Sequence, residues 1–153
     1  MLWQRVVTAL VLLPLILGAI FFLPGDGFAL AMAVAVLVAG REWAAMAKLC
    51  RYTFPVLLVI GMAGVWVLGQ LGVAVGQPLL GAAVAGWLLA LVLVVRYPAG
   101  AGWMHRRALM YLAGLLLLVP AWHAVVQLQA ITVQVAGMEL RGLVLLGAFV
   151  IVW

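Results

Sequence analysis

Long apolar runs make up most of the chain, and short groups of charged and helix-breaking residues separate them. Crossing ~30 Å of hydrocarbon as a helix takes roughly 20 apolar residues, because lipid offers no hydrogen bonds to a bare backbone. The pattern predicts helices over residues 6–23, 28–47, 55–75, 79–95, 108–126 and 142–153. We therefore expect an all-α, polytopic transmembrane bundle with five full spans and a truncated sixth.

Proline, glycine and one alternating stretch mark the connections between these runs. The Pro-Gly-Asp-Gly sequence at residues 24–27 and the Gly-Gln-Pro sequence at residues 76–78 predict tight turns. Pro14 lies inside the first run and predicts a kink. Residues 131–135 alternate with a period of two, which indicates a short extended piece on the membrane surface.

The two ends of the chain carry further expectations. The first run resembles a signal peptide, but no small-x-small cleavage site follows Phe21, so we interpret it as an uncleaved membrane helix. The sixth run reaches only from Gly142 to Trp153, which is too short to cross a bilayer. We therefore expect residues 1–153 to be the N-terminal transmembrane domain of a longer protein whose C-terminal half is absent.

Composition supports a lipid environment. Hydrophobic residues make up 71% of the 153 residues and charged residues only 7%, whereas roughly 25% charged residues is usual in soluble proteins. So few charges cannot cover a water-soluble surface, although they can decorate the ends of a membrane bundle. The same hydrophobicity excludes a disordered chain.

The net charge of +5 is arranged as in a membrane protein. Basic residues lie in short gaps between apolar runs and form no basic stripe with exposed aromatic residues, which argues against nucleic-acid binding. A cytoplasmic N-terminus places one basic residue outside, Arg141, and seven inside: Arg5, Arg41, Lys48, Arg51, Arg96, Arg106 and Arg107. This asymmetry follows the positive-inside rule and predicts that orientation.

Groups that could carry chemistry are few and scattered. A metal site needs several His, Cys, Asp or Glu ligands close together. The chain has only six such residues, spread over different gaps: Asp26, Glu42, Cys50, His105, His123 and Glu139. No GxxxxGK[ST] phosphate loop is present. We therefore predict neither a catalytic residue nor a metal ligand in this chain, and we expect Cys50 to be a free thiol.

Two groups of charged residues remain as candidates. Arg41 and Glu42 form either an intramembrane polar pair, since ionisable groups at membrane depth are often functional, or a helix end that extends to the interface. Arg96, Arg106 and Arg107 share one gap with His105. They either contact anionic lipid headgroups or phosphates or only set the topology.

Several short strings, in their order along the chain, resemble the bacterial phosphatidate cytidylyltransferases, also called CDP-diacylglycerol synthases. The strings are MLWQRVVTALVLLP at residues 1–14, FFLP at 21–24, EWA at 42–44, RYP at 96–98, LVP at 118–120 followed by Trp122, and VIVW at 150–153. Most of them are apolar, so the resemblance depends on their order and spacing over nearly the whole chain.

The resemblance implies an activity and a location. This family makes CDP-diacylglycerol and pyrophosphate from CTP and phosphatidate, with Mg²⁺, at the cytoplasmic face of the bacterial inner membrane. The family's polar signature lies near its C-terminus, beyond the last residue of this chain. The resemblance therefore assigns no catalytic residue here, places the Mg²⁺ ligands in the missing C-terminal half, and implies that this chain alone is inactive.

One alternative stays open at this point: a non-enzymatic membrane scaffold or a small transporter subunit. Against a transporter, no predicted helix carries an obvious polar pathway. The coding sequence beyond Trp153 distinguishes the two, because the enzyme requires a polar continuation that contains aspartate. The partners implied are the lipid bilayer and, for the complete enzyme, phosphatidate and CTP, while a homo-oligomer is neither required nor excluded.

Overall fold

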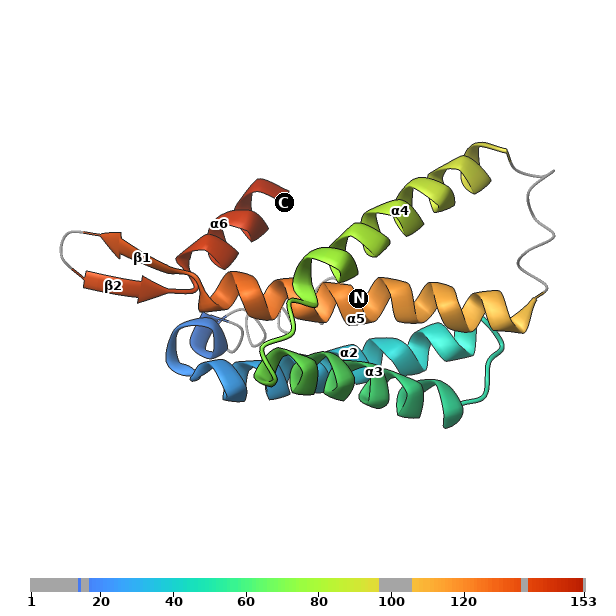
Figure 1. Cartoon of the computed structure of the whole chain (residues 1–153), viewed down its shortest axis with the longest axis horizontal. Coiled ribbons are helices and arrows are strands. Elements are labelled where there is room, and N and C mark those ends of the chain that lie inside the picture. The colour runs from blue at the N-terminus through green and yellow to red at the C-terminus, as the bar shows by residue number, and fades with distance from the viewer. Residues whose placement is uncertain (1–13, 15–16, 97–105, 136–137, 153) are drawn as a thin grey trace, which may run out of the picture. The chain divides into compact units, whose positions relative to one another are not determined.

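The structure is a computed structural model that describes residues 14, 17–96, 106–135 and 138–152 (Figure 1). Residues 17–22 are helical. The later elements are, in order, α2 (Gly25–Met46), α3 (Thr53–Gln70), α4 (Gly76–Val95), α5 (Arg107–Ala130), β1 (Thr132–Val135), β2 (Met138–Arg141) and α6 (Leu143–Val152). The helical class is confirmed over the described residues, with one β-hairpin added.

Four helices, α2 to α5, are long and apolar enough to cross a membrane. They correspond to the second, third, fourth and fifth predicted spans. Most of the predicted first span, residues 6–23, lies outside the described residues. The kink predicted at Pro14 falls in the same part of the chain. The sixth span corresponds to the ten residues of α6.

The chain forms two compact units, one of residues 33–124 and one of residues 1–32 with residues 125–153. In the first unit, α3 buries Phe54, Leu58 and Met62. Its helices approach one another at glycines. Leu58 packs against Gly40 of α2, and Leu116 of α5 packs against Gly86 of α4. Small residues permit such close packing where lipid leaves no hydrophobic force to drive helices together.

The helix ends correct three sequence expectations. The expected turn at residues 24–27 is instead the start of α2, which begins at Gly25 and has Asp26 in its first turn, where a carboxylate is favourable. The expected turn at residues 76–78 is the start of α4. Pro78 is tolerated there, because the first N–H groups of a helix have no intrahelical partner.

The expected end of the third span at residue 75 is also wrong, because α3 ends at Gln70. Gly72 has φ +77°, and the N–H groups of Gly72 and Val73 donate to Gly69 O and Leu68 O. This pairing is the Schellman arrangement, which ends a helix at a left-handed residue and is usually built on glycine.

The second unit is small and has a core of Ile20, Phe28 and Leu145. Residues 131–135 are extended as predicted, with β1 over Thr132–Val135, whereas its antiparallel partner β2 was not predicted. Gly142 follows the hairpin with φ +76°, and a Cβ at this position would meet Ile20. This combination favours glycine at the start of α6.

Candidate functional site: a basic bundle end and an apolar cavity

Basic residues gather at one end of the unit formed by residues 33–124. The loop between α2 and α3 contacts the start of α5, because the Cys50 N–H donates to the Tyr111 hydroxyl oxygen at 3.3 Å. The rings of Phe54 and Tyr111 lie 5.9 Å apart between centroids. This end carries five exposed cations, which are Lys48, Arg51, Arg96, Arg106 and Arg107.

The three arginines predicted to contact phosphates lie where α4 ends and α5 begins. Arg96 is the C-terminal cap of α4. The Arg106 carbonyl accepts hydrogen bonds from the Leu109 and Met110 N–H groups at the start of α5. Residues 97–105, which include His105, lie outside the described residues. Arg96 follows the end of α4 and Arg106 and Arg107 stand at the start of α5, so all three lie at the same end of this unit.

Cys50 lies at the same end and is exposed. Hydrogen bonds from the Thr53 side chain, then from the Thr53 and Tyr52 backbone, lower the pKa of its thiol from 9.0 to about 7. A large share of this thiol is therefore the reactive thiolate near neutral pH.

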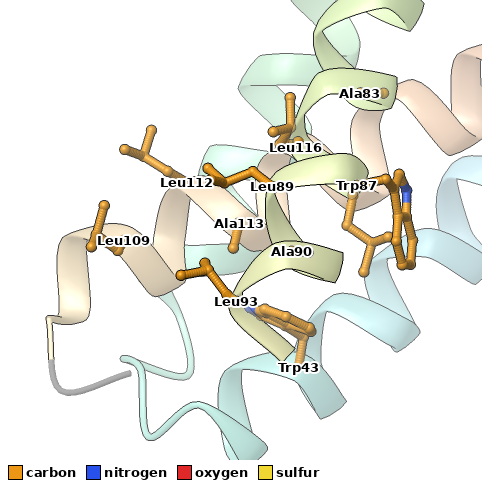
Figure 2. A pocket seen from close by; sticks show the side chains of 12 residues that line it. Trp43, Ala83, Trp87, Leu89, Ala90, Leu93, Leu109, Leu112, Ala113 and Leu116 are labelled. Carbon is orange, nitrogen blue, oxygen red and sulfur yellow. The ribbon is translucent and has the colours of Figure 1, made fainter. Parts of the chain in front are cut away.

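An apolar cavity of about 480 Å³ lies between α4 and α5, next to the basic end (Figure 2). Twelve residues line it, all of them apolar or aromatic: Trp43, Ala83, Gly86, Trp87, Leu89, Ala90, Leu93, Leu109, Leu112, Ala113, Leu116 and Leu117. Ala83, Gly86 and Ala90 are small residues on one side of α4, so they leave the space that larger side chains would fill.

Trp43 of α2 lines the cavity with its ring. Its Nε1–H donates to the Met110 carbonyl of α5 at 3.2 Å. The ring comes this close because residue 114 is glycine, where an added Cβ would lie 2.5 Å from both Trp43 Nε1 and Phe54 Cζ. The polar edge of the indole is thus occupied by α5.

The other predicted residues lie apart from one another. Arg41 and Glu42 are both exposed near the end of α2, and consecutive helical residues point about 100° apart, since a turn takes 3.6 residues. Their pairing stays a prediction. His123 is buried in α5 with its Nε2 close to Gly76, which fits a packing role. Over the described ranges, no three His, Cys, Asp or Glu residues come together as a metal site.

Sequence reasoning missed the cavity. The available signal was the spacing of Ala83, Gly86 and Ala90, three and four residues apart on one helical face. Such a row predicts either close helix packing or a groove. Which of the two occurs depends on the residues opposite the row. Here Leu109 and Leu112 of α5 line the same cavity as the row (Figure 2).

The four long apolar helices and the basic end define a multi-pass helical membrane protein. Comparison with known proteins then gives a relationship. The chain is similar to the phosphatidate cytidylyltransferase of Pseudomonas aeruginosa, with 39% identity over 133 residues, which is 84% of this chain and 48% of the relative. Over this shared part, the chain belongs to the phosphatidate cytidylyltransferase family.

Two further comparisons gave no match. No family model matches the chain, and no solved structure matches it. The chain spans about half the length of the curated relative that it matches.

Proposed function

We propose that this chain is the membrane portion of a nucleotidyltransferase that makes CDP-diacylglycerol and pyrophosphate from CTP and phosphatidate. The observation that supports this most is the 39% identity to the P. aeruginosa phosphatidate cytidylyltransferase over 133 residues. The chain's own part is to hold the remaining helices of the enzyme and to offer an apolar surface to its lipid substrate. By itself it is inactive.

The reaction requires the two phosphorylated substrates to approach each other. A phosphate oxygen of phosphatidate bonds to the α-phosphorus of CTP, while the bond from that phosphorus to the bridging oxygen of pyrophosphate breaks. Negative charge gathers on both groups, so fixed cations nearby are favourable. Arg96, Arg106 and Arg107 are the residues of this chain that we expect to contact the lipid phosphate.

Mg²⁺ belongs to the proposed reaction through the family relationship. The described residues do not fit it, since they contain no group of three carboxylate, imidazole or thiolate side chains. We therefore assign no residue of this chain to the metal, and its ligands are expected in the part of the relative that this chain does not match.

The proposed location is the bacterial inner membrane with a cytoplasmic N-terminus. Strict alternation of α2 to α5 puts the loops on either side of the α3–α4 pair, around Lys48 and Arg106, on one side of the bilayer. The positive-inside rule makes that side cytoplasmic. CTP is a cytoplasmic nucleotide, so the basic end faces the compartment that supplies it.

A chimera tests the proposal. The aligned 133 residues of the P. aeruginosa enzyme are replaced by those of this chain, and membranes are assayed for transfer of label from CTP to lipid. We expect the chimera to be active and the chain alone to be inactive. A chimera that inserts in the membrane but stays inactive, beside an active P. aeruginosa enzyme, contradicts the proposal and favours a scaffold or a small transporter subunit.

The same assay examines the arginines. Arg106→Ala and Arg107→Ala chimeras are expected to need more phosphatidate for the same rate, because each loses one charge-assisted contact to phosphate. Arg141→Ala, which removes a cation outside the basic end, serves as the control. If the rate of both variants depends on phosphatidate concentration as the rate of the unmutated chimera does, the proposed phosphate contact is contradicted.

A further inference from the structure

The depth of the apolar cavity matches one leaflet of a bilayer. On α4 its lining runs from Ala83 to Leu93, ten residues that rise about 15 Å at 1.5 Å each. The hydrocarbon core of a bilayer is ~30 Å thick, so one leaflet contributes about 15 Å. The cavity therefore extends from the basic end to about the middle of the membrane.

The lining offers a ligand almost only hydrocarbon contacts. All twelve residues are apolar or aromatic. Of the two indole N–H groups, those of Trp43 and Trp87, the Trp43 group already donates to Met110 O. A polar or charged ligand would lose its hydration here without compensation. The chemistry of the cavity thus selects an aliphatic chain.

The volume of the cavity suits a single chain-like ligand. It measures about 480 Å³, and sites for small molecules have volumes of roughly 300–1,000 Å³. A single acyl chain therefore fits, whereas a helix of a second copy on this face would give a dimer without bound lipid.

The charges beside the cavity identify the other end of the ligand. Arg96 follows the lining residue Leu93 by three positions, and Arg106 precedes Leu109 by three, so cations continue both walls of the cavity. Neither α4 nor α5 contains an acidic residue. Guanidinium groups pair with phosphate oxygens in a bidentate manner.

We propose that the cavity between α4 and α5 binds one acyl chain of an anionic phospholipid whose phosphate is contacted by Arg96, Arg106 and Arg107. The inference rests on the proposed function for its ligand class, since a lipid phosphate is the group that the enzyme would act on. It adds where in this chain such a lipid is held.

The test counts phospholipids that stay bound to the purified chain, by native mass spectrometry from detergent, with dioleoyl phosphatidate or dioleoyl phosphatidylcholine added. We expect one retained lipid, with phosphatidate preferred. Ala90→Phe fills the cavity and is expected to reduce retention to background. The matched control is Ala85→Phe, which makes the same change at an exposed position of α4 outside the lining and is expected to retain lipid as the original chain does.

A second variant changes the charge beside the cavity and leaves the lining of the cavity unchanged. Replacing Arg106 and Arg107 together by Gln is expected to lower the preference for phosphatidate by about fivefold per arginine, a basic residue near an anionic lipid being worth about that factor, while phosphatidylcholine is still retained. Equal retention by the Ala90→Phe and Ala85→Phe variants, an unchanged preference in the arginine variant, or a lipid-free dimer of the original chain would each overturn the proposal.

The outcome is independent of catalysis, because no CTP is present. Retained lipid together with an inactive chimera contradicts the proposed function alone. An active chimera whose isolated membrane portion retains no phospholipid contradicts the cavity as a lipid site and leaves the proposed function intact.

Discussion

Gln129 is a buried polar residue that joins two segments within its unit. Its side-chain Nε2–H group donates to Ile20 O at 3.2 Å and to Leu23 O at 3.4 Å. These carbonyls lie at the end of the helix over residues 17–22, where the last C=O groups lack intrahelical partners. Gln129 therefore caps that helix from a distant part of the sequence.

Replacing Gln129 by Leu should destabilise the fold by about 1–3 kcal/mol, because the buried Ile20 carbonyl and the part-buried Leu23 carbonyl lose their donor. Gln129→Glu should cost more, since it turns acceptor oxygens toward those carbonyls. Unfolding in sodium dodecyl sulfate, followed by circular dichroism, measures the change. Gln127→Leu, at an exposed position of the same helix, is the control. If Gln127→Leu lowers the stability as much as Gln129→Leu does, the capping role is contradicted.

Cys50 supports a prediction on pH dependence. Because hydrogen bonds lower the pKa of its thiol to about 7, about half of it is thiolate at pH 7, against about 1 in 100 for a thiol of pKa 9. Its reaction with N-ethylmaleimide should thus be half-maximal near pH 7. Thr53→Val removes the side-chain hydrogen bond that lowers the pKa most. The reaction rate of this variant should therefore be lower at pH 7 and equal to that of the original chain near pH 10. Identical pH profiles would show that Thr53 does not set the reactivity.

At the scale of elements, the bundle of residues 33–124 depends on places where helices touch at a glycine. α5 contacts α2 through Gly114 and Trp43, and it contacts α3 where Gly61 meets Val119. It continues through Pro120, which is buried. α4 differs, since none of its residues is buried. Its exposed faces suit contact with lipid, as the cavity beside it also indicates.

Gly114→Ala should destabilise the bundle by about 1–3 kcal/mol, because its Cβ would lie 2.5 Å from the rigid Trp43 ring and force the helices apart. Gly64→Ala is the matched control, since nothing lies within 4 Å of its Cβ. That change should be neutral or slightly stabilising in a helix. Unfolding midpoints in detergent compare the two, and equal midpoints would show that the Trp43 contact is not tight.

At the scale of the whole molecule, the packing gathers basic residues from distant parts of the sequence at one end. The cations at the basic end come from three separate parts of the sequence, around residues 48–51, 96 and 106–107. The hydrogen bond between Cys50 and Tyr111 joins the first part to the third. A single end that carries this much positive charge favours the cytoplasmic side of a membrane.

The orientation can be measured with the single cysteine of the chain. A maleimide that does not cross membranes should label Cys50 in inverted inner-membrane vesicles and leave it unlabelled in spheroplasts. A variant with Cys50→Ser and Thr132→Cys moves the thiol to β1 and should give the opposite pattern. Labelling of Cys50 from outside would show that the N-terminus is not cytoplasmic.

The sequence by itself determined the solvent and the helical class of this protein. Runs of about 20 apolar residues have only one way to satisfy their backbone in lipid, so the spans of α2 to α5 followed from length and hydropathy alone. The family relationship also followed from the order of short strings. The ends of the helices did not, since Gly25 and Gly76 begin helices where glycine and proline predicted turns.

The tertiary structure decided which residues meet. Trp43, Ala90 and Leu112 come from three helices, and no periodicity within one helix says that they surround one cavity. Likewise, Gln129 bonds to Ile20 across more than a hundred residues. Local sequence determines the conformation of a segment through its backbone hydrogen bonds, whereas such contacts depend on how whole helices pack, which is set by many side chains together.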